Sequence, residues 1–406
     1  MKQFDFSQNP FLVVWETTRA CQLACKHCRA VAQKMRDPRE LTTDEAKRLL
    51  DDIYAMGNPV LVLSGGDPLE RPDLFELIEY GTKRGLRVSI TPSATPRVTR
   101  EAIARAKQAG LARWAFSLDG SHAGIHDKFR GTPGSFDLTV QAIRWLQDLQ
   151  LPLQINTTVS RDNLGDLEEM ASLVERLQAV LWSVFFLIPT GRGQLRDMIS
   201  PEEHEQVLNW LYELSQRVPF DIKTTEAHHY RRVFLQRRKQ DRRSGQEDGS
   251  SPQPQGMAVT RRTAERQSAA GLQDVCGGQR AGGSAPWLKG VPGLASGGIG
   301  RAPRGVGDGN GFLFISHIGD IYPSGFLPVK CGNIRRDDLA SVYRESPVFQ
   351  ALRNPDGFRG KCGYCEFRYI CGGSRSRAYA VTGDYLESEP CCIYIPDPRR
   401  KGTAVL

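Results

Sequence analysis

The stretch Cys21-Gln-Leu-Ala-Cys25-Lys-His-Cys28 decides the fold. Its three cysteines form a C-x3-C-x2-C array directly after the apolar run Phe11-Leu-Val-Val-Trp15. Thiolates are soft ligands that favour iron–sulfur clusters, zinc or copper. A cubane cluster is usually held by four cysteines, so three would leave one iron open to a ligand from outside the chain. The alternatives are three buried thiols, or a zinc site with His27 as the local candidate for a fourth ligand.

The length and composition of the chain are sufficient for a sizeable hydrophobic core. Its 406 residues, 40% of them apolar, suggest two or three domains. Lys and Arg outnumber Asp and Glu by 54 to 46, but the basic residues are not gathered on one helix with interleaved aromatics, as nucleic-acid binding would favour. An anionic substrate or cofactor explains this excess equally well, so no nucleic-acid partner is expected.

The sequence gives no sign of a membrane or secretion signal. The longest apolar run, residues 179–189, is too short to span a bilayer, and residues 1–6 lack the apolar region of a signal peptide. A cytoplasmic protein is therefore expected. In that reducing compartment, ten cysteines indicate metal binding and not disulfides.

Strand and helix patterns alternate through the first half of the chain. Buried apolar runs predict parallel strands, and capping residues and glycines bound the helices between them. The expected strands are 11–17, 59–63, 86–91, 112–118, 153–159 and 180–188, and the expected helices are 42–57, 72–85, 99–109, 135–149, 164–177 and 200–217. Since a full (β/α)8 barrel needs two more units, an α/β fold with a partial (β/α)6 TIM-type barrel fits best. Its active site would lie at the carboxyl ends of the strands.

Three domains are expected. Residues 1–219 form the barrel, residues 220–310 a glycine-rich and partly disordered linker or insert, and residues 311–406 a small C-terminal iron–sulfur domain. The insert carries Cys276, which has no partner at metal-ligand spacing. The C-terminal part should begin with a hairpin at 312–322 and continue with a helix at 339–352.

Polar residues follow the later strands at the rim that should carry the site. The second strand ends in Ser64-Gly-Gly-Asp-Pro68, where glycines allow close backbone approach to a ligand. The fourth strand ends at Ser117, with Arg130 shortly after it, and Asn156 lies on the fifth. Each also has an ordinary interpretation, as a turn, a helix cap, a surface charge or a polar rim residue.

The cysteine array, followed one βα unit later by Gly-Gly-Asp-Pro, resembles the radical S-adenosylmethionine (radical SAM) superfamily. The resemblance implies that Cys21, Cys25 and Cys28 hold a 4Fe–4S cluster whose open iron binds the amino and carboxylate groups of S-adenosylmethionine. It also implies cofactor contacts from six residues. Gly65, Gly66 and Asp67 would meet the ammonium, Ser117 and Arg130 the carboxylate, and Asn156 the ribose. No catalytic residue beyond these is singled out.

A second cysteine cluster lies in the tail. Cys362, Cys365 and Cys371 are followed by adjacent Cys391 and Cys392, and four thiolates saturate either a cubane cluster or a tetrahedral zinc. Beside a radical SAM core this pattern resembles the SPASM extension, which implies an auxiliary 4Fe–4S cluster. The fuller SPASM pattern has a cysteine where Ser324 stands, so one auxiliary cluster is expected, with Cys331 outside it. The choice between Cys391 and Cys392 stays open.

The tail from Cys362 to Ala378 is most similar to the haem-forming branch, which decarboxylates propionates of an iron porphyrin or modifies them for haem d1. In that interpretation Arg375 and Arg377 could meet propionates, and His228 or His229 the porphyrin iron. The alternatives are a supporting or surface role for the arginines and a solvated helix end for the histidines.

The sequence thus predicts an enzyme that cleaves S-adenosylmethionine to a 5′-deoxyadenosyl radical and abstracts hydrogen from a substrate. The auxiliary cluster would accept an electron or hold the substrate, and a flavodoxin- or ferredoxin-type donor would supply electrons. The first substrate candidate is a tetrapyrrole propionate, and the second a peptide, protein or small molecule, as for a SPASM maturase. A non-catalytic zinc or iron–sulfur RNA-binding protein is the alternative from another class.

Overall fold

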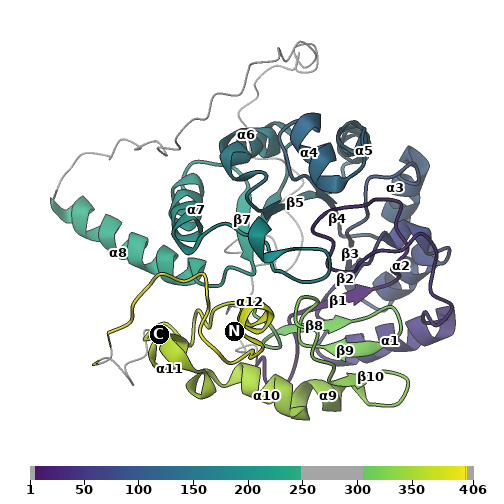
Figure 1. Ribbon diagram of the computed structural model, residues 1–406. Helices are drawn as coiled ribbons and strands as arrows, with labels where there is room; N and C mark the ends of the chain where they lie inside the picture. Colours follow the sequence, from purple (N-terminus) through teal and green to yellow (C-terminus); the bar gives the residue numbers. More distant parts are fainter. Residues whose placement is uncertain (1–4, 248–304, 398, 400–406) are drawn as a thin grey trace.

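The computed structural model describes residues 5–247, 305–397 and 399. A single sheet runs through these residues in the order β10-β9-β8-β1-β2-β3-β4-β5-β6-β7, and Figure 1 shows it curving around the centre of the molecule. Strands β1 to β7 are parallel, β8 joins the free edge of β1 in parallel, and β9 and β10 continue antiparallel. The strands are β1 (Leu12–Glu16), β2 (Val60–Ser64), β3 (Arg87–Ile90), β4 (Arg113–Ser117), β5 (Leu153–Val159), β6 (Leu181–Phe186), β7 (Asp221–Thr225), β8 (Phe312–Ile315), β9 (Asp320–Tyr322) and β10 (Gly332–Asn333).

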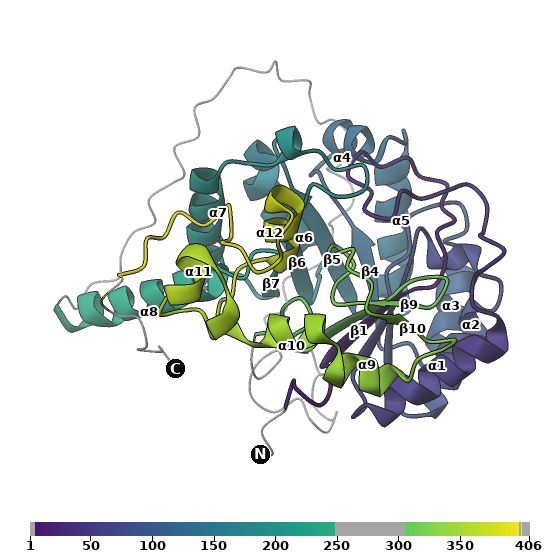
Figure 2. The ribbon, with the colours of Figure 1, turned by 60° about the horizontal axis from the view of Figure 1, so that its bottom comes forward.

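Helices cover the outside of this sheet. Of the four helices described in the C-terminal part, the first two lie near β9 and β10 and the last two lie toward β7 (Figure 2). Helix α8 projects from the body of the molecule in Figure 1. The helices are α1 (Thr43–Ala55), α2 (Leu74–Lys83), α3 (Arg100–Gln108), α4 (Ala123–Arg130), α5 (Ser135–Asp148), α6 (Leu167–Arg176), α7 (Pro201–Leu214), α8 (Tyr230–Glu247), α9 (Leu339–Glu345), α10 (Pro347–Arg353), α11 (Gly360–Tyr364) and α12 (Arg375–Thr382). In the described part of the chain, none of them combines the length and apolar character that a bilayer span requires.

Local sequence signals place the helices of the barrel. The capping box expected at the start of α1 is present: the Glu45 amide donates to Thr42 Oγ1 (3.2 Å) and the Thr42 amide to Glu45 Oε2 (2.8 Å). These bonds satisfy amides that have no partner within the helix. Just beyond the end of α1, Gly57 turns the chain with a φ of 88°, a conformation that glycine adopts without strain. Ser200 and Glu203 form the second capping box, at the start of α7.

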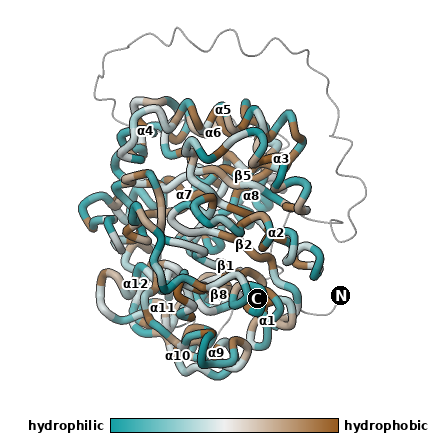
Figure 3. The backbone as a smooth tube through the Cα atoms, turned by 90° about the vertical axis from the view of Figure 1, so that its right-hand side faces the viewer, coloured by the Kyte–Doolittle hydropathy of each residue, from teal (hydrophilic) through white to brown (hydrophobic). Residues whose placement is uncertain are grey.

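Strand alternation separates the hydrophobic core from the interior of the barrel. In β5 the odd-numbered positions 153–159 are buried and the even positions between them are half-buried, because successive side chains point to opposite faces. The buried set packs under the helices with large side chains such as Trp114 and Trp182. Figure 3 shows hydrophobic segments along the strands in the interior of the molecule. The other face of each strand is left free to line a site.

The predicted partial barrel of six βα units is confirmed, and the structure adds to it at both edges. Residues 221–247, which the sequence assigned to the insert, form β7 and α8, and the rest of that insert with Cys276 lies outside the described residues. The predicted helix at 339–352 is two helices, because Pro347 lacks the amide that would continue α9. The hairpin at 312–322 is confirmed as β8 and β9, and its first strand extends the barrel sheet.

At the rim of the barrel, a buried carboxylate joins the loop after β1 to the turn between β8 and β9. Glu16, the last residue of β1, is fully buried and binds Arg29 Nη2 (2.7 Å), Arg19 Nε (3.1 Å) and His317 Nδ1 (3.0 Å). Burial alone would raise the pKa of Glu16, but Arg29, His317 and Arg19 outweigh it and lower this pKa from 4.5 to about 2. Arg19 and Arg29 flank the cysteine array, and His317 lies in the β8–β9 turn, so one carboxylate holds both segments to β1.

Replacing Glu16 by Gln should destabilise the protein strongly. The lowered pKa corresponds to roughly 3 kcal/mol of unfolding free energy at pH 7. This stability is complete above pH 4.5 and is lost as the pH falls towards about 2, where the folded state binds the proton. Urea unfolding of wild type and Glu16→Gln at pH 7 measures it directly. Glu76→Gln is the control, since its ion pair with Lys47 is partly exposed and should contribute below about 1 kcal/mol. Equal effects of the two substitutions would contradict this account.

Candidate active site

A cavity of about 870 Å³ opens at the carboxyl ends of the parallel strands. Its volume is near the top of the range of about 300–1,000 Å³ typical of small-molecule sites, so a cofactor and part of a substrate can be held together. Its wall extends from β8 across the whole barrel to β7 and includes apolar rings at one side, among them Phe185, Phe314 and Phe326. The three cysteines of the N-terminal array line the same cavity.

Hydrogen-bond donors from the loop after β1 and from the end of α4 point at the sulfur atoms of this array. The Leu23 amide donates to Cys21 Sγ (3.4 Å), the Ala32 amide to Cys28 Sγ (3.4 Å) and Arg130 Nη1 to Cys25 Sγ (3.6 Å). Such donors stabilise a thiolate and adjust the potential of a bound iron–sulfur cluster. No three His, Cys, Asp or Glu side chains in the described ranges are grouped to hold a single metal ion; here three thiols face one large cavity.

The predicted glycine pair lies where the end of β2 packs on the loop that leads to Cys21. A Cβ at Gly66 would approach the carbonyl oxygens of Ala20 and Arg19 to 2.4 and 2.6 Å, and one at Gly65 would approach Thr18 O to 2.5 Å. Both glycines also line the cavity. Any larger residue would therefore push the cysteine loop away from the strand, so the pair is needed for the shape of the site itself.

Asp67, predicted to face the cofactor, lies outside the cavity wall. Its Oδ1 accepts from the Leu69 amide (3.1 Å) and its Oδ2 from Thr95 Oγ1 (3.1 Å), and the side chain is fully buried. Burial raises the pKa of Asp67 to about 7. Asp67 caps the short 3₁₀ turn Pro68–Glu70, because its carboxylate is the local partner of that turn's free amide. Its contact with the cofactor stays a prediction.

Ser117 and Asn156 belong to a row of polar side chains across the barrel. Ser117 on β4 is in register with Asn156 on β5, Asn156 with Ser183 on β6, and Ser183 with Lys223 on β7. All four line the cavity. Adjacent strands thus present one polar residue each at the same height, which is how parallel strands assemble a site from distant sequence positions.

Arg130 lines the cavity between the cysteine array and a buried acid. Its Nη2 is 2.5 Å from Asp119 Oδ2, and its Nη1 contacts Cys25 Sγ. Burial raises the pKa of Asp119 even though Arg130 opposes this rise. The arginine ends α4, a helix that the sequence analysis did not predict. Asp119 therefore positions the guanidinium beside the cysteine array.

Lys223 is a cavity residue that sequence reasoning missed, because β7 was assigned to the insert. It is exposed to the cavity. Desolvation by the surrounding protein, with repulsion from Arg113 and Arg231, lowers its pKa from 10.5 to about 8. The short alternation in Asp221-Ile-Lys-Thr-Thr225 was the available signal for this strand. Lys223 therefore adds a cationic group to this side of the cavity, where Arg231 also lines the wall.

A second, narrow cavity contains four of the five tail cysteines. Cys362, Cys365, Cys371 and Cys392 line it together with His229. Three of the four sulfur atoms accept a hydrogen bond from the backbone amide two residues further along the chain. The donors are the amides of Phe367 to Cys365, Tyr394 to Cys392 and Gly373 to Cys371 (3.4 Å). The Glu389 amide donates to Cys362 Sγ (3.3 Å). Burial raises the pKa of Cys365 to about 11 and also raises the pKa of Cys371 and of Cys392, and the amide donors partly oppose this rise. The four thiols share one buried environment with an amide donor at each sulfur atom.

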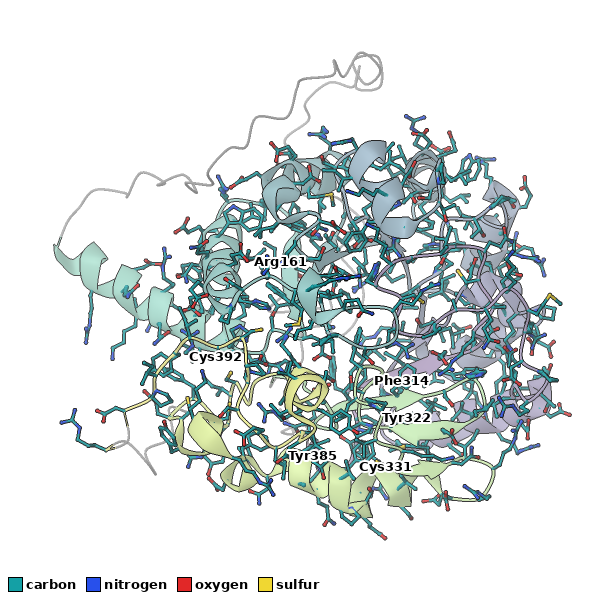
Figure 4. All side chains as sticks on the ribbon, in the orientation of Figure 1. Arg161, Phe314, Tyr322, Cys331, Tyr385 and Cys392 are labelled. Atoms are coloured by element: carbon teal, nitrogen blue, oxygen red, sulfur yellow. The ribbon has the colours of Figure 1, made fainter. Side chains whose placement is uncertain are left out.

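Cys391 and Cys331 lie apart from this group. Cys391 packs against Leu187 and Met198 and is absent from the wall of the second cavity. Figure 4 shows Cys331 in the region of β9 and β10, well away from the labelled Cys392. The structure therefore separates the two adjacent cysteines that the sequence could not distinguish.

The two arginines and two histidines suggested to contact a porphyrin lie in different places relative to the large cavity. Arg375 and Arg377 are buried outside the large cavity: Arg375 Nη1 donates to Glu387 O (2.6 Å), and Arg377 binds Glu389 Oε1 (3.0 Å). Neither side chain lines that cavity in this structure, and their contact with a propionate stays a prediction. His228 and His229 are buried and not at a solvated helix end. His228 faces the large cavity and His229 the second one.

A parallel half-barrel with three thiols beside a glycine pair at its rim defines a radical SAM enzyme. The radical SAM superfamily model matches residues 15–174, and the chain belongs to this superfamily. Membership implies a 4Fe–4S cluster and S-adenosylmethionine as cofactors, and the thiols, amide donors and cavity described above fit that pair. The crystal structure of Streptococcus suis SuiB bound to S-adenosylmethionine shares the fold, with a TM-score of 0.64 at 14% identity over 95% of this chain and 78% of that chain.

Curated relatives extend the similarity along nearly the whole chain. The AdoMet-dependent heme synthase of Methanosarcina barkeri is 39% identical over 95% of this chain and 97% of its own length. The protein of the same name from Nitratidesulfovibrio vulgaris is 39% identical over 97% and 94%. Mycofactocin maturase MftC of Mycobacterium tuberculosis is 35% identical over 95% and 83%.

Replacing Gly66 by Ala should disrupt the cysteine loop. The new methyl group would overlap Ala20 O and Arg19 O, and such overpacking costs about 1–3 kcal/mol. We expect Gly66→Ala to bind less iron and sulfide after anaerobic reconstitution and to form 5′-deoxyadenosine at least about 10-fold more slowly. Gly165→Ala is the matched control, because nothing lies within 4 Å of its new methyl group. Wild-type iron content and cleavage in Gly66→Ala would contradict this packing argument.

Proposed function

We propose that this enzyme decarboxylates propionate side chains of an iron tetrapyrrole, as in the last steps of a haem-forming route. The observation that carries the proposal is the 39% identity to proteins named AdoMet-dependent heme synthase, which extends over almost their full length. Loss of a hydrogen atom, CO2 and one electron converts a propionate into a vinyl group. The site must therefore accept a large, flat, apolar molecule that carries carboxylates.

The large cavity suits such a substrate. Its apolar rings can pack against the faces of a macrocycle, and Lys223 and Arg231 at its wall can pair with carboxylates. Arg231 Nη1 is bonded to Ile370 O (3.1 Å), whereas no hydrogen bond or ion pair is found for Lys223 within the described residues. Of these two, Lys223 is thus the cation better placed to recognise a propionate.

The chain's own residues hold and shield the reacting groups. Cys21, Cys25 and Cys28 would hold the 4Fe–4S cluster, which with S-adenosylmethionine supplies a 5′-deoxyadenosyl radical when bound. The polar row on β4 to β7, beginning with Ser117 and Asn156, would orient the nucleoside by hydrogen bonds, and Gly65 and Gly66 would admit its ammonium group. Arg130 stays beside the cysteine array because Asp119 fixes it. The enclosing barrel excludes water from the radical.

We further propose Cys362, Cys365, Cys371 and Cys392 as the ligands of one auxiliary 4Fe–4S cluster. Four thiols lining one cavity, each met by an amide donor, support this set. His229 adds two ring nitrogens for which the described part of the chain provides no hydrogen-bond partner. This cluster would take up the electron released by the substrate. A flavodoxin- or ferredoxin-type protein would supply the electron for the first cluster.

The function is tested with anaerobically reconstituted enzyme, S-adenosylmethionine, dithionite and iron-coproporphyrin labelled with deuterium in its propionates. We expect mass spectrometry to show loss of carboxyl groups and deuterium in 5′-deoxyadenosine. A peptide substrate is the second candidate, because the similarity to a mycofactocin maturase also covers most of the chain. Cleavage of S-adenosylmethionine without any decarboxylation of the porphyrin would refute the tetrapyrrole proposal and favour a peptide.

Exchanging the two adjacent cysteines separately tests the auxiliary site. We expect Cys392→Ser to lose the iron and sulfide of one cluster and to stop substrate turnover, while cleavage of S-adenosylmethionine continues. Cys391→Ser is the matched control and should keep both clusters, since Cys391 packs against Leu187 and Met198. Iron analysis and electron paramagnetic resonance (EPR) of the reduced proteins distinguish the two. The reverse result would show that the fourth ligand is Cys391.

Removing the charge of Lys223 should weaken substrate binding. A hydrogen bond to a charged group contributes about 1.5–3 kcal/mol, so Lys223→Met should raise the Kd for coproporphyrin roughly 10- to 100-fold. Because the pKa of Lys223 is about 8, wild-type affinity should fall as the pH rises above 8, and this dependence should vanish in Lys223→Met. Fluorescence titration with metal-free coproporphyrin measures both. Lys223→Arg, which keeps the charge, is the control; an equal loss in it would argue against a charge effect.

A further inference from the structure

We propose that His228 is the axial ligand through which this enzyme binds the iron of its tetrapyrrole substrate. This inference rests on the proposed function, and it concerns the substrate's metal and not a resident cofactor. His228 lies in the loop between β7 and α8, is 8% exposed, and lines the large cavity. Neutral imidazole nitrogens are good ligands for iron.

A hydrogen bond sets the tautomer of His228. Its Nδ1 lies 2.6 Å from Gly373 O, and since a carbonyl oxygen can only accept, Nδ1 carries the proton. Nε2 therefore keeps its lone pair, and no hydrogen bond to Nε2 is found among the described residues. Metal-bound histidines typically donate their other nitrogen to a carbonyl in this way, which orients the ring and strengthens it as a ligand.

Electrostatics keep His228 available for a metal. Burial, followed by repulsion from Arg231, lowers its pKa from 6.5 to about 4, so the ring is neutral at physiological pH. A protonated ring could not bind iron, since its lone pair would be used. The geometry alone carries the proposal, and the neutral state agrees with it.

The wall beside His228 leaves room for a flat molecule. Gly307 lies beside Cε1 of the ring, between its two nitrogens: a Cβ at position 307 would lie 3.5 Å from Cε1, 3.8 Å from Nε2 and 3.9 Å from Nδ1. A side chain there would obstruct a macrocycle whose iron approaches Nε2. Phe326 and Ile370 line the same cavity and provide apolar surface for its faces.

The two other histidines of this cavity are less suited. Among the described residues, His27 and His126 also line it. The Asp119 amide donates to His126 Nδ1 (3.2 Å), so the proton of His126 lies on Nε2, which then has no free lone pair. His27 packs on Phe129, with ring centroids 4.4 Å apart, directly beside Cys28. His228 is thus the cavity histidine with an available nitrogen away from the cysteine array.

The test uses cluster-loaded enzyme and ferric or ferrous iron-coproporphyrin under anaerobic conditions. We expect EPR and resonance Raman spectra of the wild-type complex to show a histidine-ligated iron. His228→Ala should lose this signature, bind iron-coproporphyrin at least about 10-fold more weakly, and regain the signature with added imidazole. Metal-free coproporphyrin should bind both proteins equally, because only the iron contact is removed.

Two further variants control for folding and for a general histidine effect. His228→Gln can still donate to Gly373 O, so it should keep the iron and sulfide of both clusters, which reports on folding, while it loses the iron signature. His122→Ala, at the N-cap of α4 and outside the cavity wall, should leave the signature unchanged.

The outcomes separate this inference from the proposed function. An unchanged iron signature in His228→Ala, or equal weakening of iron and metal-free porphyrin, would overturn axial ligation even if decarboxylation occurs. Histidine-ligated binding without decarboxylation would support the ligand and refute the reaction. No binding of iron-coproporphyrin by wild type would overturn both.

Discussion

The contact between Glu16 and the side chains of Arg19, Arg29 and His317 is the constraint on which the site depends. A carboxylate at the end of β1 would be costly to bury alone, and three cationic or polar partners from separate segments compensate for it. Two of them border the cysteine array and the third belongs to the C-terminal hairpin. The radical site and the C-terminal part are therefore tied to the same strand end, and neither can shift without exposing or unpairing this charge.

The register of the parallel strands brings polar residues from distant parts of the sequence together at the cavity wall. Because β4 to β7 are parallel and in register, Ser117, Asn156, Ser183 and Lys223 form one polar row although they lie far apart in sequence. The apolar side chains of the same strands alternate with them and build the core on the opposite face. Stability and function thus use opposite faces of the same strands, which lets the cavity be polar without weakening the core.

Two neighbouring histidines stand between the two cavities. His228 lines the large cavity and is held by Gly373 O, and Gly373 follows the tail cysteine Cys371 by two positions. His229 lines the second cavity instead. If a tetrapyrrole iron binds at His228, its macrocycle lies next to the residues proposed to hold the auxiliary cluster, a short route for the electron that decarboxylation releases.

The sequence by itself determined the six βα units, the capping boxes and the array Cys21, Cys25, Cys28, because strand and helix periods, caps and ligand spacing are local properties of the chain. It could not place β7, whose five residues give too short a pattern, nor divide 339–352 into two helices. Only the tertiary structure decided that Cys392 and not Cys391 joins the other tail thiols, that Asp67 is a cap, and that His228 has a free nitrogen facing the cavity. These features depend on contacts between segments that are distant in the sequence. Such contacts produce no periodic pattern of residues from which they could be predicted.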